Sequence, residues 1–293
     1  MRTILLISLI AFSTLCHSTT TLPIHVVAAE NIYGSVAKEL GGNYVVVTSL
    51  LNNPTSDPHL FSITPSTAKA MTEADIIIYN GADYDPWIQP LLTMATPSQR
   101  KVIEVASLTL VHSGDNPHIW YSPETMPLFA KAFVAALIQT DPAHKLYYQS
   151  QLQQFNNRYQ RIFKTVSSLK KRFQNIDVIA TEPIFGYMAH SIGLKMHGDD
   201  FQIKIMNDVP PTISQIKQFE DDIRSHHIRV LIYNNQVINP FTQRMRSLAI
   251  AEGIPVIGVN EIMPNHVTYI EWMMTQLQRL ETALSEKNKA KSP

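Results

Sequence analysis

Two short segments of the chain place a histidine directly after an Asx-Pro pair. They are Asp57-Pro58-His59 and Asn116-Pro117-His118, and an aromatic residue, Phe61 or Trp120, follows two residues after each histidine. Proline restricts the backbone and Asp or Asn favours a turn, so each imidazole should be held on a stiff loop. Neutral imidazole is the commonest metal ligand in proteins, and a metal site needs ligands that are already in place. The repeat makes both histidines candidate ligands, although either one alone is better explained as a loop or core histidine.

Two glutamates follow expected strands at comparable positions. Glu182 comes two residues after a strand expected at 177–180, and Glu261 two residues after one expected at 255–259. Ligands of α/β proteins gather outside the carboxyl ends of the strands, which makes both carboxylates candidate ligands. A glutamate in the first turn of a helix is also favoured by the helix dipole, and for either residue alone that explanation is the better one.

The composition limits which metal sites are possible. The chain has 293 residues, with 24 Lys+Arg, 24 Asp+Glu, 11 His and a single Cys. One cysteine excludes zinc and iron–sulfur sites built from cysteines, so a bound metal must be held by His and carboxylates. The balanced charge gives no overall field toward nucleic acid or anionic lipid, and we expect no nucleic-acid partner. Hydrophobic residues make up 45% of the chain, which excludes a disordered protein.

The first 18 residues have the pattern of a secretory signal peptide. Arg2 precedes an apolar run from Thr3 to Leu15, which is too short for a transmembrane helix, and small residues follow. A buried N-terminal helix is the alternative. We expect no lipid anchor at Cys16, because Leu15 stands where a small residue is needed. Removal of the segment would leave a periplasmic protein without any thiol, which suits an oxidising compartment.

Strands and helices alternate along the rest of the chain. Apolar runs predict strands at 25–29, 75–80, 101–105, 177–180, 228–233 and 255–259. Helical periodicity predicts helices at 31–40, 64–74, 213–225, 240–252 and 268–284. Thr64 is the expected N-cap of the second of these, with Pro65 at its first position.

One stretch, from residue 142 to 173, keeps helical periodicity without a glycine, and it lies near the middle of the chain. The alternation predicts an α/β protein of two lobes, each with a mainly parallel sheet flanked by helices. We expect the lobes to cover residues 19–141 and 174–293, joined by one long bridging helix over residues 142–173.

Taken together, these segments resemble the solute-binding proteins of metal-ion ABC transporters, the zinc/manganese-binding cluster known as bacterial solute-binding protein family 9. The resemblance covers nearly the whole chain after the signal segment. It is carried by Asp57-Pro58-His59 with Thr64-Pro65 and Tyr79-Asn80-Gly81, by Asn116-Pro117-His118-Ile119-Trp120, by Glu182 with Phe185-Gly186-Tyr187, and by Tyr269 with Trp272-Met273. It implies two α/β lobes bridged by one long helix.

The resemblance also implies a function and a ligand set. Members capture a divalent ion, Zn²⁺ or Mn²⁺, between the lobes with four protein ligands and deliver it to a membrane ABC permease. By position, the first three ligands are His59, His118 and Glu182. The family's fourth ligand is usually an Asp, where this chain has Asn260 followed by Glu261. We assign Glu261, because a carboxylate oxygen suits such a cation better than an amide. The expected protein is a monomer and not an enzyme.

Two other functions fit the same residues. A periplasmic metal-dependent hydrolase would need an open coordination position and a nearby general base, which four protein ligands would not leave. An adhesin or a binder of metal chelates on the same scaffold would need a roomy cleft. No sequence pattern pairs the other histidines, so we expect none of His190, His197, His226, His227 and His266 to be a ligand.

Overall fold

The computed structural model describes residues 22–56, 58–93 and 100–286. The expected signal segment with Cys16, as well as Asp57 and the side chain of His59, lie outside this description. The described chain contains two four-stranded sheets, ordered β2-β1-β3-β4 and β6-β5-β7-β8. Every pairing in both sheets is parallel, which confirms the α/β fold with parallel sheets.

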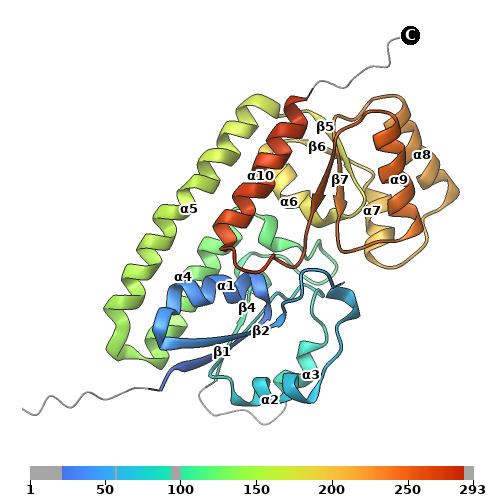
Figure 1. The fold of residues 1–293 in the computed structure, drawn as a ribbon. Coiled ribbons are helices and arrows are strands. Elements are labelled where there is room, and N and C mark those ends of the chain that lie inside the picture. Colours follow the sequence, from blue (N-terminus) through green and yellow to red (C-terminus); the bar gives the residue numbers. More distant parts are fainter. Residues whose placement is uncertain (1–21, 57, 94–99, 287–293) are drawn as a thin grey trace, which may run out of the picture.

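The first sheet and its helices come from the first half of the chain (Figure 1). Its strands are β1 (Ile24–Glu30), β2 (Val45–Leu51), β3 (Ile76–Tyr79) and β4 (Lys101–Glu104). Its helices are α1 (Asn31–Gly41), α2 (Pro65–Glu73), α3 (Ile88–Leu92) and α4 (Thr125–Thr140). The central strands β1 and β3 are almost entirely buried, as their continuous apolar sequences predict for a parallel sheet covered on both faces.

The second sheet is built in the same way from the second half of the chain. Its strands are β5 (Asp177–Ala180), β6 (Lys195–His197), β7 (Leu231–Asn234) and β8 (Val256–Val259). Its helices are α6 (Gly186–Ile192), α7 (Asp199–Met206), α8 (Ile213–Arg224), α9 (Pro240–Ala251) and α10 (Tyr269–Ser285). None of the described helices is both long and apolar enough to cross a membrane.

Four of the described helices begin with a capping box, in which the N-cap and N3 side chains each accept from the other's backbone N–H. The pairs are Thr64 with Thr67, Thr212 with Gln215, Asn239 with Thr242, and Thr268 with Glu271. Each box satisfies backbone donors that a helix start otherwise leaves unpaired. The N-cap predicted at Thr64, with Pro65 in the first turn, is confirmed.

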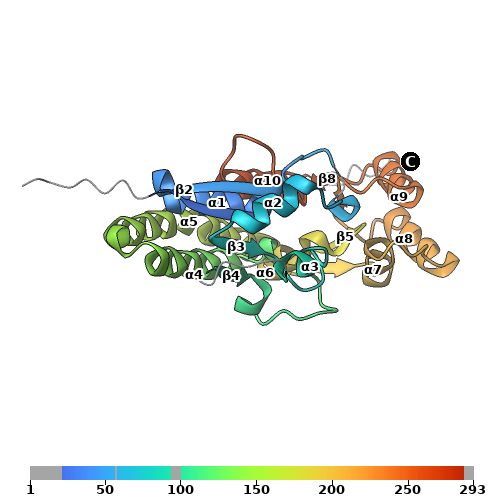
Figure 2. The ribbon, with the colours of Figure 1, turned by 90° about the horizontal axis from the view of Figure 1, so that it is seen from below.

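A single helix of 29 residues, α5 (Lys145–Phe173), runs along both lobes. It contacts α1 and α4 of the first lobe and α6 and α10 of the second, and Figures 1 and 2 show it beside these helices. The expected long helix is therefore present. It begins three residues late because Pro142–His144 form a separate 3-10 turn.

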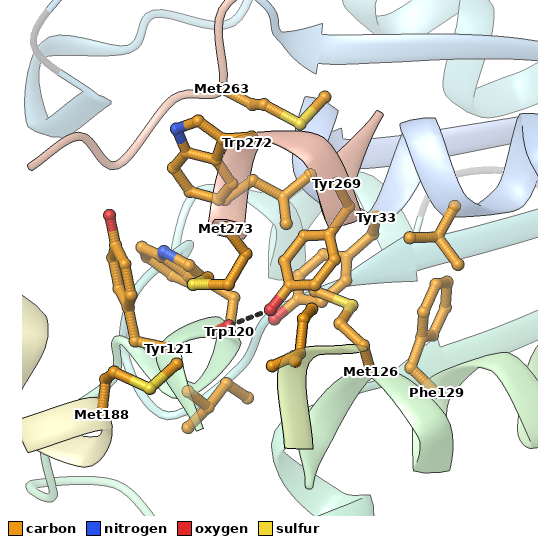
Figure 3. Packing of buried hydrophobic residues seen from close by; sticks show 14 of the residues in the cluster. Tyr33, Trp120, Tyr121, Met126, Phe129, Met188, Met263, Tyr269, Trp272 and Met273 are labelled. Carbon is orange, nitrogen blue, oxygen red and sulfur yellow. Dashed lines mark hydrogen bonds between the residues drawn. The ribbon is translucent and has the colours of Figure 1, made fainter. Parts of the chain in front are cut away.

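The largest hydrophobic core is continuous through both lobes. Tyr33 of α1, Trp120 of the first lobe and Tyr269 of α10 lie together in it, and the Tyr269 hydroxyl donates to the Trp120 carbonyl at 2.7 Å (Figure 3). Because a wide separation of the lobes would expose these rings, the packing resists such a motion.

Candidate metal centre

Three of the four predicted ligands converge where the two lobes meet. His118 precedes the 3-10 turn Ile119–Tyr121, Glu182 follows β5 and Glu261 follows β8. All three residues are at most 2% exposed. The His118 Nε2 atom lies 3.6 Å from Glu261 Oε2, so a ligand candidate of the first lobe faces one of the second.

The ring of His118 is held by the asparagine two residues before it. Its Nδ1 lies 2.7 Å from Asn116 Oδ1, and the same oxygen accepts from the His118 backbone N–H at 3.1 Å. With the proton on Nδ1 donated to this amide oxygen, the lone pair is on Nε2. Nε2 is buried and has no hydrogen-bond partner among the described residues. Metal-binding histidines characteristically donate their other N–H in this way.

Asn116 also connects this loop to the opposite lobe. Its Nδ2 donates to the carbonyl of Pro183 at 2.7 Å, directly after Glu182. The side chain of Glu182 makes no cap hydrogen bond to the 3-10 turn that follows it, Pro183–Phe185. Glu182 therefore stands at the N-cap position of this turn without forming a cap hydrogen bond there.

The two carboxylates share one amide donor at the end of β7. Asn234 Nδ2 lies 2.7 Å from Glu182 Oε2 and 2.5 Å from Glu261 Oε1. The Tyr84 hydroxyl donates to Glu261 Oε2 at 2.7 Å. Burial raises the pKa of Tyr84 well above its usual value, so this hydroxyl keeps its proton and remains a donor.

The geometry separates Asn260 from Glu261. The Asn260 side chain accepts from Asn235 Nδ2 at 2.8 Å, and its backbone carbonyl accepts from the Tyr121 hydroxyl at 2.8 Å. It is thus Glu261 whose carboxylate lies with His118, whereas the amide of Asn260 is bonded to Asn235.

The backbone of His59 lies in the 3-10 turn Pro58–Leu60, and its side chain is beyond what the structure describes. The loop before it is fastened to the Glu261 loop through Gln236. Gln236 Nε2 donates to the Pro54 carbonyl at 2.9 Å, while its Oε1 accepts from the Glu261 backbone N–H at 2.6 Å. This contact brings the segment that carries His59 to the same junction of the lobes.

The comparison with known families is decisive for the class of protein. The family model described as zinc-uptake complex component A, periplasmic, matches residues 26–283. The chain belongs to this family.

Individual relatives of this chain are distant in sequence. The metal ABC transporter substrate-binding lipoprotein SloC of Streptococcus mutans is 24% identical over 247 residues, 79% of this chain and 78% of that protein. The iron-binding protein YfeA of Yersinia pestis is 23% identical over 257 residues, 81% of this chain and 80% of that protein.

Solved structures share the fold. The periplasmic zinc-binding protein TroA of Treponema pallidum has a TM-score of 0.76 at 16% identity, over 91% of this chain and 100% of that one. The Mn-bound periplasmic metal-binding protein of Candidatus Liberibacter asiaticus has a TM-score of 0.71 at 20% identity, over 88% and 98% of the two chains.

Two further carboxyls are buried near this junction and are not candidate ligands. Glu30 ends β1, and Asp85 accepts from the backbone N–H groups of Asn80 and Gly81 at 2.7 and 2.9 Å. Burial raises the pKa of Asp85 to about 6. Burial, and then the negative charge of Asp85, raise the pKa of Glu30 well above its ordinary value of 4.5. Both shifts favour the protonated form of these carboxyls.

Replacing Glu30 with Gln should stabilise the metal-free protein at high pH. Above pH 4.5 the unfolded wild-type chain releases the Glu30 proton while the folded protein keeps it, so wild-type stability falls as the pH rises. Gln has no such proton, and the advantage of the variant should grow as the pH rises above 4.5, by up to about 1.4 kcal/mol per pH unit. Urea unfolding in EDTA at several pH values measures this difference in the free energy of unfolding. The exposed Glu73→Gln is the control, and parallel pH profiles for wild type and Glu30→Gln would contradict the prediction.

Proposed function

We propose that this protein captures a divalent transition-metal ion, Zn²⁺ or Mn²⁺, between its lobes and delivers it to a membrane ABC permease. The observation that carries the proposal is the buried Nε2 of His118, oriented by Asn116 and facing a carboxylate of the other lobe. The ligands we propose are His59, His118, Glu182 and Glu261. Relatives of this chain are named as transporter proteins for manganese or metal ions and as an iron-binding protein, which supports a transition-metal ion as the bound species.

The donor set suits such an ion. Two imidazoles and two carboxylates form a mixed nitrogen and oxygen site, which takes Zn²⁺ by general affinity and Mn²⁺ through geometry and supply. The two carboxylates of Glu182 and Glu261 neutralise a divalent cation, so that its burial between the lobes is tolerable. With four protein ligands no position remains for a reacting water, which supports a binding protein rather than a hydrolase.

We propose a cavity beside these residues as the entry route for the ion. A cavity of about 430 Å³ is lined by residues of both lobes, among them Tyr84, Asn116, Pro183 and Gln202. Tyr84 and Asn116 contact Glu261 and His118, so the cavity borders the proposed site. An ion could reach the ligands from solvent through it.

The location we infer is the periplasm, in agreement with the description of the family. Several relatives are named as lipoproteins. For this chain we propose a protein released after its signal segment, because Leu15 before Cys16 argues against a lipid anchor. We also propose that it acts as a monomer.

Isothermal titration of the metal-free protein with ZnCl₂ and with MnCl₂ tests the proposal. We expect submicromolar binding, and His59→Ala and His118→Ala should each weaken it at least tenfold through loss of a ligand. The exposed His112→Ala is the matched control and should leave affinity unchanged. Absence of submicromolar binding of either ion, or unchanged affinity in His118→Ala, would contradict the proposal.

A further inference from the structure

A second group of metal-type side chains lies in the C-terminal lobe, away from the site described above. Asp177 is the first residue of β5, His197 the last residue of β6, and His227 follows α8. One ligand atom from each lies within 4.8 Å of the others. His197 Nε2 is 2.8 Å from Asp177 Oδ1, and the two imidazole rings are 4.9 Å apart. We propose that these three residues form a second, solvent-open site for a divalent transition-metal ion.

This group is separate from the site between the lobes. Asp177 stands at the amino end of β5, whereas Glu182 follows the carboxyl end of the same strand. Ile179, which pairs with His197, points into the small core formed with α7 and α8. The group therefore lies at the rim of that core and shares no residue with the site at the lobe junction.

The backbone holds each of the three residues. The Asp177 carbonyl accepts from Arg229 N–H at 2.7 Å, and the His197 carbonyl accepts from Gln202 Nε2 at 2.7 Å. The His227 N–H donates to the Asp222 carbonyl at 3.2 Å. The ligand candidates thus come from β5, from β6 and from a tied loop, which keeps their spacing fixed.

The carboxylate of Asp222 lies close to the imidazole of His227. Asp222 Oδ1 lies 3.7 Å from His227 Nδ1, and its side chain is 12% exposed. Carboxylates next to metal-binding histidines commonly orient the ring and raise its basicity. The hydrogen bond from His197 lowers the pKa of Asp177, so this ligand is already ionised at neutral pH.

The donor set and the exposure define the ion. Two imidazoles and one carboxylate suit Zn²⁺, Cu²⁺ or Ni²⁺ and are poor ligands for Mg²⁺ or Ca²⁺. The side chains of His197, Asp177 and His227 are 28%, 29% and 54% exposed, so solvent can complete the coordination. The positive charge of Lys195 also lies near Asp177 and opposes a cation. The bound ion should therefore exchange readily and bind more weakly than the ion between the lobes.

Isothermal titration of the metal-free full protein with ZnCl₂ tests the second site. We expect two sites per chain, and His227→Ala should weaken the weaker one at least tenfold without changing the tighter one. The matched control is His226→Asn, because His226 is the adjacent histidine and has φ +54°, which Asn tolerates. His118→Ala should do the reverse of His227→Ala, which keeps failure of the second site distinct from failure of the first.

One site per chain in the wild type, or a weaker site unaffected by His227→Ala, would overturn the proposal. A crystal soaked with ZnCl₂ and measured at the zinc edge provides an independent result. We expect an anomalous peak in contact with Asp177, His197 and His227, and its absence at zinc concentrations that saturate the weaker site would refute the assignment.

Discussion

Replacing Glu261 with Gln should weaken Zn²⁺ binding by at least a hundredfold. Loss of a group that merely supports a metal ligand costs about 10–100-fold, and this change removes a proposed ligand outright. It also leaves Glu182 as the one carboxylate of the proposed ligand set to neutralise a buried divalent ion, and uncompensated buried charge is costly. The shape of the side chain is kept, and the backbone N–H of residue 261 can still donate to Gln236. Titration with ZnCl₂ measures the change.

The neighbouring Asn260→Ala is the matched control for this variant. The Asn260 amide bonds to Asn235 rather than lying with His118, so its removal should change Zn²⁺ affinity only a few-fold, as expected for a residue that contacts no ligand directly. Thermal unfolding without metal shows whether either variant is misfolded. A larger loss of affinity in Asn260→Ala than in Glu261→Gln would transfer the fourth ligand to Asn260.

The candidate site could be predicted from the sequence as far as it depends on local patterns. The Asx-Pro-His repeat identifies His118 because the turn that holds the ring is built from adjacent residues, Asn116 and His118. Asn234 was missed because no local pattern marks it. Its role follows from sheet order, since β7 lies between β5 and β8 and its last residue can bridge Glu182 and Glu261.

The fold, too, could be predicted where an element has a clear local pattern and not where it depends on sheet order. The long helix α5 has uninterrupted periodicity, and buried strands such as β3 are continuous apolar runs. The edge strand β6 has three residues, Lys195-Met196-His197, which is too short for a period-two pattern. Without β6 in the sheet nothing brings His197 to Asp177, which is why no local pattern pairs His197 with His227 or Asp177.

Adding Zn²⁺ to the metal-free protein should raise its thermal unfolding midpoint by roughly 10 °C. An ion present at 1,000 times its dissociation constant stabilises the folded state by about 4 kcal/mol, and each kcal/mol shifts the midpoint of a chain of this size by about 2–4 °C. The stabilisation should shrink as the pH is lowered from 8 to 5, because imidazole and carboxylates must be deprotonated to bind the metal. Differential scanning calorimetry with and without ZnCl₂ measures both effects.

Variants at the two sites assign this stabilisation to one of them. In His118→Ala most of the shift should be lost, because the proposed site would no longer link His118 of the first lobe to Glu261 of the second through an ion. In His227→Ala most of it should remain, because that site is solvent-open and binds more weakly. Since the continuous core joins the two lobes, a bound ion adds to an existing contact. A shift in His118→Ala equal to that of the wild type would contradict a buried site that joins the lobes.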